Sequence, residues 1–425
     1  MGLLLQGGLL VDPVGKRIAR ADVLVEDGYI AAVGDRLSAS GHEVRNVADL
    51  FVAPGLIDVH VHLREPGFGY KETIESGTRA AAAGGFTQVC CMPNTLPVTD
   101  SVDTVRWIRE EAARCGHAAV HPIAAVTEGS RGERLTDFPA LCAAGAVAFS
   151  DDGRGVQSAA VMREALLSAS RIGVPVAVHA EDESLSAGGC VHAGETAREL
   201  GLPGIPPEAE TAMIARDIVL AAATGAHVHF CHVSPAAAVE AIRAGKRLGV
   251  RATAEVAPHH LLLNDGLLRT HGGYAKVNPP LRSEPDREAC VRGLLDGTLD
   301  IIATDHAPHA ADEKARPLTE ASFGFSGLEI SLPTMFTAFV HSGVWPVHEL
   351  VARMSLLPAR IFGLAGGRIA VGARADIAVI DPFVERVVQP DDFFSKGRVT
   401  PFAGRRLYGW PVLTVHAGRV VHDAL

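Results

Sequence analysis

The alternation of hydrophobic and polar positions divides the chain into three stretches. In the first fifty residues, short apolar runs at 2–5, 22–26 and 29–33 predict strands, and the dipeptides Asp27-Gly28 and Gly34-Asp35 predict turns between them. From Gly55 the pattern changes to strand, loop and helix, repeated along the chain. After about Gly366 the sequence pattern again predicts strands.

The middle stretch predicts a closed barrel. Helical periodicity between the strands is clearest at 71–83, 102–114, 159–171, 208–223 and 235–248, while the seventh interval is the least regular and 190–206, rich in Gly and Pro, is predicted to be a loop. Strands alternating with helices favour a (β/α)8 TIM-type barrel. The eight expected strands are 56–61, 87–92, 118–124, 146–149, 174–178, 228–231, 251–255 and 301–303.

Both chain ends are expected to join outside the barrel. We predict a catalytic barrel over residues 54–365 and a small flanking β-sandwich domain built from residues 1–53 and 366–425. The alternative is two unrelated terminal arms. Such an architecture matters for function because the active sites of these barrels lie at the carboxyl ends of the strands.

Composition narrows the class of protein. The 425 residues carry a formal net charge of −10 and contain no run of Lys and Arg, so neither nucleic acid nor an anionic membrane is an expected partner. The seven cysteines form no C-x-x-C pair, which favours a reducing cytoplasm over a disulfide framework. We also expect no signal peptide and no membrane span.

Histidine and aspartate recur where the predicted strands end. His60 and His62 share one face of the first strand because alternate side chains point the same way. A single such residue is more often a structural histidine or a helix N-cap than a ligand. Five strand ends of this kind in one barrel nevertheless favour a metal site. The other residues at these ends are Asp151, Asp152, His179, His232 and Asp305.

The type of ligand indicates the metal. Imidazole nitrogen and carboxylate oxygen without thiolate suit Zn, Mn, Fe or Co, and zinc is our first expectation. Four histidines and two carboxylates exceed one tetrahedral site, so we favour two Zn²⁺ ions per chain over one. The sequence alone therefore predicts a metal-dependent hydrolase.

The chain resembles the amidohydrolase superfamily and, within it, the bacterial dihydroorotases. Nine segments in the expected order carry the resemblance, which extends over nearly the whole chain. They are Asp-Val-His-Val-His-Leu-Arg-Glu-Pro-Gly (58–67), Lys-Glu-Thr-Ile-Glu-Ser-Gly-Thr (71–78), Ala-Ala-Ala-Gly-Gly-Phe-Thr (81–87), Met-Pro-Asn-Thr (92–95), Ser-Asp-Asp-Gly (150–153), Val-His-Ala-Glu (178–181), Cys-His-Val-Ser (231–234), Val-Asn-Pro-Pro-Leu-Arg (277–282) and Thr-Asp-His-Ala-Pro-His (304–309).

The resemblance implies a role for each metal-site residue. His60 and His62 would bind the more buried ion, and His179 and His232 the second. Asp305 would face the first ion and act as the proton shuttle. Many relatives bridge the two ions with a carboxylated lysine after the fourth strand. This chain has Asp151 and Asp152 there, and motif alignment favours Asp152 as the bridge over Asp151.

Further residues are expected to bind the substrate. The planar guanidinium of Arg64, two residues after His62, suits a carboxylate. By resemblance, Asn94 and His309 would bind the same carboxylate, and Asn278 the ring. The loop Ser322-Phe323-Gly324, where relatives often have Pro-Phe-Gly, would meet the ring through the backbone of Phe323 and Gly324. We expect His259 and His260 to be structural and His229 to face away from the site.

The implied activity is the reversible cyclisation of N-carbamoyl-L-aspartate to L-dihydroorotate and water, a step in pyrimidine biosynthesis. The first alternative is a hydantoinase, dihydropyrimidinase or allantoinase, relatives that generally carry the bridging lysine and lack the Arg64 and Asn94 clamp. The second is a non-catalytic scaffold for aspartate transcarbamoylase, which the complete ligand set disfavours. A homodimer and a complex with that transcarbamoylase both stay open.

Overall fold

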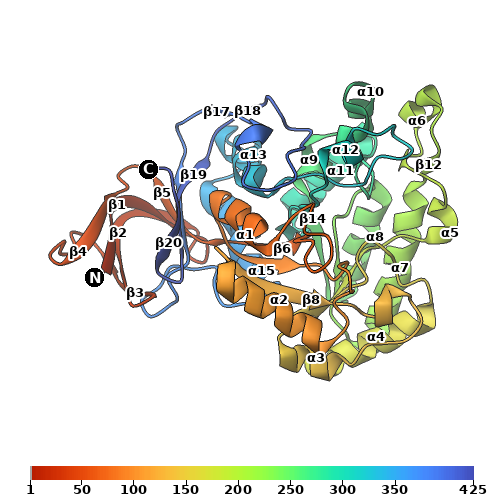
Figure 1. The fold of residues 1–425 in the computed structure, drawn as a ribbon, viewed down its shortest axis with the longest axis horizontal. Coiled ribbons are helices and arrows are strands. Elements are labelled where there is room, and N and C mark those ends of the chain that lie inside the picture. Colours follow the sequence, from red (N-terminus) through yellow and green to blue (C-terminus); the bar gives the residue numbers. More distant parts are fainter. Residues whose placement is uncertain (1) are drawn as a thin grey trace.

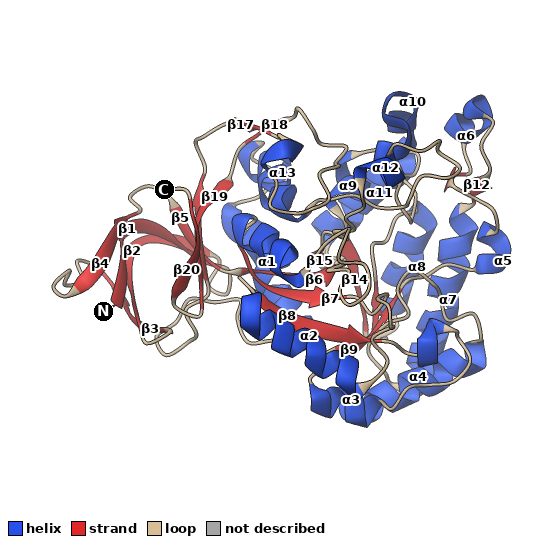
Figure 2. Ribbon diagram, viewed as in Figure 1, coloured by secondary structure: helices blue, strands red, loops and turns tan. Residues whose placement is uncertain are grey.

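The structure is a computed structural model that describes residues 2–425, and its centre is a barrel (Figures 1 and 2). Within these residues, eight parallel strands pair in chain order, and a bridge between Val61 and His306 closes the ring. The predicted (β/α)8 barrel is therefore confirmed. The barrel strands are β6 (Leu56–Val61), β7 (Phe86–Cys91), β8 (Ala119–Ala124), β9 (Ala148–Phe149), β10 (Val176–Val178), β13 (Val228–Phe230), β14 (Ala252–Val256) and β15 (Ile301–Ile302).

Helices surround the barrel, and the five predicted from periodicity are all present within two or three residues. α1 begins at Ile74, later than expected, because the side chain of Thr73 caps it by accepting from the Ser76 N–H. The helices that surround the barrel are α1 (Ile74–Ala83), α2 (Val102–Cys115), α3 (Phe138–Ala144), α4 (Ala159–Ile172), α7 (Pro207–Thr224), α8 (Ala236–Arg247), α11 (Glu284–Asp296), α13 (Ser331–Met335), α14 (Val347–Val351) and α15 (Leu357–Phe362).

Short elements fill several loops at the carboxyl ends of the strands. The expectation of a plain loop over 190–206 is wrong, because β11 (Val191–His192) and β12 (Gly204–Ile205) pair there around α6 (Glu195–Leu200). The irregular seventh interval contains two short helices before α11. The remaining short helices are α5 (Glu183–Ser186), α9 (Pro258–Leu262), α10 (Leu268–His271) and α12 (Ala311–Lys314).

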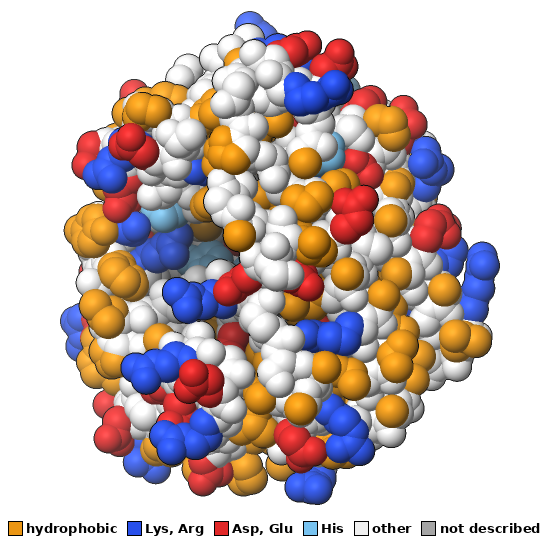
Figure 3. All heavy atoms as spheres, turned by 90° about the vertical axis from the view of Figure 1, so that its right-hand side faces the viewer, with side chains coloured by type: hydrophobic (Ala, Val, Ile, Leu, Met, Phe, Trp, Pro, Cys, Tyr) orange, Lys and Arg blue, Asp and Glu red, His pale blue; other side chains and the backbone are white. Residues whose placement is uncertain are grey.

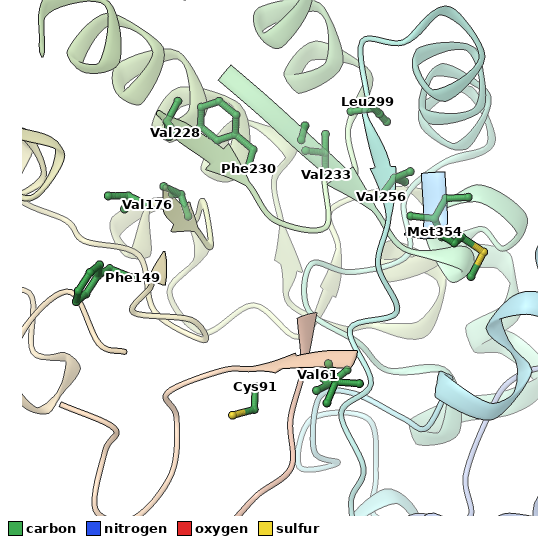
Figure 4. Close-up of a cluster of buried hydrophobic side chains, with 14 of the residues drawn as sticks. Val61, Cys91, Phe149, Val176, Val228, Phe230, Val233, Val256, Leu299 and Met354 are labelled. Atoms are coloured by element: carbon green, nitrogen blue, oxygen red, sulfur yellow. The ribbon is translucent and has the colours of Figure 1, made fainter. Parts of the chain in front are cut away.

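Alternate residues of the barrel strands face two different apolar layers. Val176 and Phe230 belong to the large cluster that packs against the surrounding helices (Figure 4). The neighbouring residues Ala177 and Cys231 belong to a second cluster inside the barrel, which Phe362 of α15 joins. The inside of the barrel is thus a packed apolar core that contains only a few polar side chains, such as His229 and Glu255.

A second sheet flanks the barrel and contains both chain ends, so the predicted flanking β domain is present (Figure 2). In the described part of the chain it has eight strands. The sequence from Gly367 onward was expected to form a strand, but the first C-terminal strand of the sheet covers only residues 377–381. The strands are β1 (Gly2–Asp12), β2 (Arg17–Glu26), β3 (Tyr29–Gly34), β4 (His42–Asn46), β5 (Phe51–Pro54), β16 (Ile377–Asp381), β19 (Trp410–His416) and β20 (Arg419–Asp423).

The segment between β16 and β19 leaves this sheet and covers part of the barrel. It contains the small hairpin of β17 (Arg386–Val387) and β18 (Arg406–Leu407), and its Phe393 and Phe402 pack in one cluster with Leu263 and Phe325 of barrel loops. The division of the chain after residues 53 and 365 stays a prediction. None of the helices in residues 2–425 is long and apolar enough to cross a membrane.

Candidate metal centre

The predicted site residues meet in one cavity at the carboxyl ends of the barrel strands. The cavity has a volume of about 180 Å³. Figure 3 shows this end of the molecule, with histidine visible in a hollow beside Lys and Arg side chains. Of the predicted site residues, only His60, which is fully buried, does not line this cavity. The predicted residues that line the cavity are His62, Arg64, Asn94, Asp152, His179, His232, Asn278, Asp305, His309, Phe323 and Gly324.

The carboxylate of Asp152 lies at the centre of the four histidines. Its Oδ1 is 3.3 Å from His60 Nε2 and 3.6 Å from both His179 Nδ1 and His232 Nε2. Its Oδ2 is 3.6 Å from His62 Nε2. Within residues 2–425, Asp152 is therefore the only carboxylate within 4.0 Å of ring nitrogens of both pairs, His60 with His62 and His179 with His232.

Asp151 points away from this cluster. Its Oδ1 accepts from the backbone N–H of Thr127 at 3.1 Å, and its Oδ2 accepts from the Thr127 hydroxyl at 2.5 Å. Both oxygens are thus used to anchor the loop after β8. The geometry favours Asp152 over Asp151 as a metal ligand.

Acceptors on the far side fix the orientation of three of the histidine rings. His60 Nδ1 is 2.5 Å from Glu255 Oε1, and His62 Nδ1 is 2.9 Å from Asn94 Oδ1. His179 Nε2 is 3.0 Å from Glu181 Oε2. A ring nitrogen that donates to an acceptor leaves the other nitrogen with a free lone pair for a metal. In each case that free nitrogen faces Asp152.

The cluster has the electrostatics of a cation site. Burial alone would lower the pKa of His60 and His179, but nearby carboxylates raise the pKa of His60 well above its usual value and that of His179 to about 10. Among residues 2–425, His60 Nε2 and Asp152 Oδ1 are buried without a hydrogen-bond partner. Buried polar atoms are rarely left unpaired, so these donors fit a bound metal ion.

Asp305 lies against the same histidines. Its Oδ1 is 3.2 Å from His62 Nε2 and 3.6 Å from His60 Nε2. Although burial opposes ionisation, the neighbouring imidazoles lower the pKa of Asp305 below its usual range, which keeps its carboxylate ionised. Asp305 has a positive φ of 48°, as do His232 at 35° and Arg64 at 63°. Backbone strain of this kind clusters at functional sites.

Arg64 brings an unpaired positive charge to the cavity. Its Nε donates to the Pro308 carbonyl at 3.2 Å, and within residues 2–425 no carboxylate lies within ion-pair distance of its guanidinium. His309 beside it is neutral, because burial and the charges of Arg64 and Lys71 lower its pKa to about 3. Its Nε2 donates to the Phe323 carbonyl at 2.7 Å. The guanidinium of Arg64 is therefore suited to receive an anionic group.

The remaining predicted residues form the opposite wall. Asn278 Nδ2 donates to Glu181 Oε2 at 2.6 Å, which joins the substrate side of the cavity to His179. Gly324 has a φ of 110°, and a Cβ there would lie 2.5 Å from the Ala307 side chain. Its N–H donates to the Lys276 carbonyl at 3.0 Å. This position therefore requires glycine.

Sequence reasoning missed the carboxylates that support the histidines. Glu255 ends the predicted seventh strand, so the same strand-end argument could have identified it. His229 was expected to face away, but it points into the barrel and lies 3.1 Å from Glu255 Oε2. His259 and His260 do not line the cavity, which fits the structural role predicted for them.

Comparisons with known proteins identify the family. A family model described as Dihydro-orotase-like matches residues 50–237, and an amidohydrolase family model matches residues 339–422. The dihydroorotase of Geobacillus kaustophilus is 49% identical over 100% of this chain and 99% of its own length. That of Pelotomaculum thermopropionicum is 50% identical over 99% of this chain and 98% of its own. The chain belongs to the dihydroorotase family.

Solved structures of other cyclic-amide hydrolases share the fold of this dihydroorotase-family chain. L-hydantoinase from Arthrobacter aurescens has a TM-score of 0.89 and 27% sequence identity, covering 99% of this chain and 96% of that one. Dihydropyrimidinase from Brevibacillus agri has a TM-score of 0.85 at 24% identity. The architecture is thus shared with a hydantoinase and a dihydropyrimidinase. The dihydroorotase family is distinguished here by sequence.

Proposed function

We propose that the protein is a dihydroorotase, which interconverts N-carbamoyl-L-aspartate and L-dihydroorotate. The observation that carries the proposal is the unpaired guanidinium of Arg64 in the same cavity as the metal-site residues. Both compounds present a carboxylate, which a planar guanidinium binds through two hydrogen bonds. Hydantoin, dihydrouracil and allantoin have no carboxylate for it to bind.

We further propose that the cluster holds zinc, with two ions favoured over one. His60 and His62 would hold one ion with Asp305, and His179 and His232 the other, with Asp152 between them. The mutually close donors His60, His62 and Asp305 support the first site, and a second close group of His60, Asp152 and His232 places Asp152 between the two histidine pairs. A ligand set of nitrogen and oxygen suits zinc. Elemental analysis of the purified protein would test metal identity and number.

The residues of the chain divide the chemistry among them. Bound zinc supplies a Lewis acid and hydroxide at neutral pH. Arg64 holds the substrate carboxylate and so fixes the ring, with His309 beside its guanidinium, while Asn278 and Phe323–Gly324 meet the polar edge of the ring. In ring opening, Asp305 accepts the proton of water and returns it to the leaving ring nitrogen. In ring closure, it takes the proton from the carbamoyl nitrogen and passes it to the carboxyl oxygen that leaves as water, whose second proton comes from solvent.

Asn94 has a supporting place in this scheme. Its Oδ1 accepts from His62, and its Nδ2 lies 3.3 Å from Asp152 Oδ2. The amide therefore orients two metal-site residues, and because Asn94 lines the cavity, its Nδ2 would also meet a substrate carboxylate. We propose that Asn94 links carboxylate recognition to the metal centre.

Parallel turnover measurements would test the proposed activity. The zinc-loaded protein would be given L-dihydroorotate, hydantoin, dihydrouracil and allantoin under the same conditions. We expect kcat/KM to be highest for dihydroorotate. A preference for any of the uncharged rings would contradict the proposal and favour the hydantoinase class, whose fold this chain shares.

We also propose a cytoplasmic location, since all seven cysteines are free within the described residues. A homodimer and a complex with aspartate transcarbamoylase are two assemblies to test. Light scattering of the purified protein would give its mass in solution, and copurification with the transcarbamoylase, followed by activity of each subunit alone, would test the complex. Loss of turnover in the isolated chain would favour the scaffold alternative.

A further inference from the structure

A row of hydrogen-bonded polar side chains runs through the barrel below the metal centre. Strands β13 and β14 are neighbours, and His229 pairs with Thr253 in their register. Because alternate residues share a face, His229 of β13 and His227 just before that strand point inward, as do Thr253 and Glu255 of β14. Most of their surroundings are apolar, including Cys231, Ala177 and Phe362.

The distances connect these residues in one chain. His227 Nε2 and His229 Nδ1 are each 2.8 Å from Thr253 Oγ1. His229 Nε2 is 3.1 Å from Glu255 Oε2, and Glu255 Oε1 is 2.5 Å from His60 Nδ1. The lower end opens at His227 and Thr253 into a cavity of about 650 Å³ at the opposite mouth of the barrel. The upper end is a metal-site histidine.

The donors and acceptors in this chain have a single consistent direction. An ionised carboxylate only accepts, so Glu255 receives protons from both His60 Nδ1–H and His229 Nε2–H. A His229 ring that carries its proton on Nε2 accepts at Nδ1, and the Thr253 hydroxyl supplies that proton. The Thr253 oxygen in turn accepts from His227 Nε2–H. The Nδ1–H of His60 is thus directed at Glu255, and Nε2 is the ring nitrogen that faces the metal site.

We propose that Glu255 and Thr253 are positioning residues that hold His60 in its metal-binding tautomer. Glu255 acts directly on the ring, while Thr253 acts through His229 and Glu255. Outer partners of this kind change metal affinity by about 10–100-fold when they are removed. The inference rests on the proposed metal centre, but it concerns metal binding rather than the identity of the substrate.

Two variants would test the row of hydrogen bonds, one at Glu255 next to His60 and one at Thr253, two hydrogen bonds further away. In Glu255→Gln, the amide accepts from one ring and presents N–H to the other, so either His60 or His229 must change tautomer. We expect its Zn²⁺ affinity, measured by competition with a chromophoric chelator, to fall by about 10–100-fold. Thr253→Val keeps the shape but removes the hydroxyl, and we expect a smaller loss. The visible spectrum of Co²⁺ in the site should change in both.

Controls separate this role from packing. Thr253→Ser keeps the hydroxyl and should retain wild-type affinity and spectrum. Thr87→Val makes the same substitution on β7, where Thr87 Oγ1 is buried and has no partner within the described residues, and should leave metal binding unchanged. Circular dichroism would confirm that each variant is folded.

The outcome at Thr253 decides the inference. If Thr253→Val matches Thr87→Val in Zn²⁺ affinity and in the Co²⁺ spectrum, the row of hydrogen bonds from Thr253 to His60 does not orient the His60 ring, and the proposal is wrong. Failure of the proposed function would look different. In that case the wild-type protein would bind metal, with the variants weakened as expected, but would not turn over dihydroorotate.

Discussion

At the scale of single residues, the site separates the group that moves a proton from the group that recognises charge. Asp305 contacts the histidine cluster, whereas Arg64 lies in the same cavity without an ion-pair partner among residues 2–425. Removal of the first should therefore affect the chemical step, and removal of the second should affect substrate recognition.

Asp305→Asn should abolish most turnover. The amide keeps the size of the side chain and an oxygen toward His62, but it cannot accept a proton at neutral pH. General acid–base groups contribute about 10²–10⁴-fold, so we expect kcat to fall by that factor in both directions of the reaction. Zinc content would be measured alongside as the control. A variant with normal zinc and normal kcat would overturn the proton-shuttle role.

Arg64→Met should weaken recognition of the substrate carboxylate. Truncating one partner of a buried, hydrogen-bonded charge pair costs about 2–5 kcal/mol, and we expect kcat/KM for dihydroorotate to fall accordingly. Arg64→Lys should recover part of the loss because it keeps the charge but not the planar fork. Slow turnover of an uncharged ring, if detectable, should be unaffected. Equal losses for both types of substrate would argue against a carboxylate clamp.

At the scale of elements, the barrel was predictable because its strands and helices have distinct periodicities. The strand ends carrying His60, His179 and His232 were therefore found from the sequence. The carboxylates behind them were not, since Glu255 and Glu181 support the rings from strands and loops whose contacts are set by tertiary packing. The short elements of 190–206 were also missed, because two-residue strands carry no measurable periodicity.

Helix α7 contains a buried charge that should make stability depend on pH. Asp217 is fully buried, and burial raises its pKa to about 6, although Arg216 at 2.8 Å opposes the shift. The folded-state pKa thus lies above the unfolded value of about 3.9. Stability from this group is present below about pH 4 and is lost as the pH rises through 6.

Asp217→Asn should remove this pH dependence. A shift of about two pKa units corresponds to about 3 kcal/mol, so the free energy of unfolding of the variant relative to wild type should rise by that amount between pH 4 and pH 7.5. Urea unfolding with a chelator present at both pH values would measure it without interference from metal. The exposed Asp391→Asn serves as the control. A constant difference between variant and wild type would show that Asp217 does not titrate on folding.

At the scale of the whole molecule, distant parts of the chain converge on the mouth of the barrel. The segment between β16 and β19 places Ser395 against Glu72, to whose Oε2 it donates a hydrogen bond at 2.5 Å. The same oxygen is 3.3 Å from His306 Nε2, and His306 both closes the barrel and follows Asp305. The C-terminal third of the chain thereby supports the proposed proton shuttle, a link between distant residues that no local sequence pattern predicts.

Metal removal should consequently destabilise the whole protein. The metal-site residues come from β6 and from the ends of β9, β10, β13 and β15, so an ion bound there would join strands from around the entire barrel. A ligand that binds only the folded state at a thousandfold excess over its Kd adds about 4 kcal/mol to the free energy of unfolding. Chelation should therefore lower the urea midpoint, and added Zn²⁺ should restore it. Asp152→Asn should show a much smaller response, because it lacks the central ligand. If chelation strips the metal, as elemental analysis would verify, and the wild-type midpoint does not move, the cluster is not a site that couples metal binding to folding.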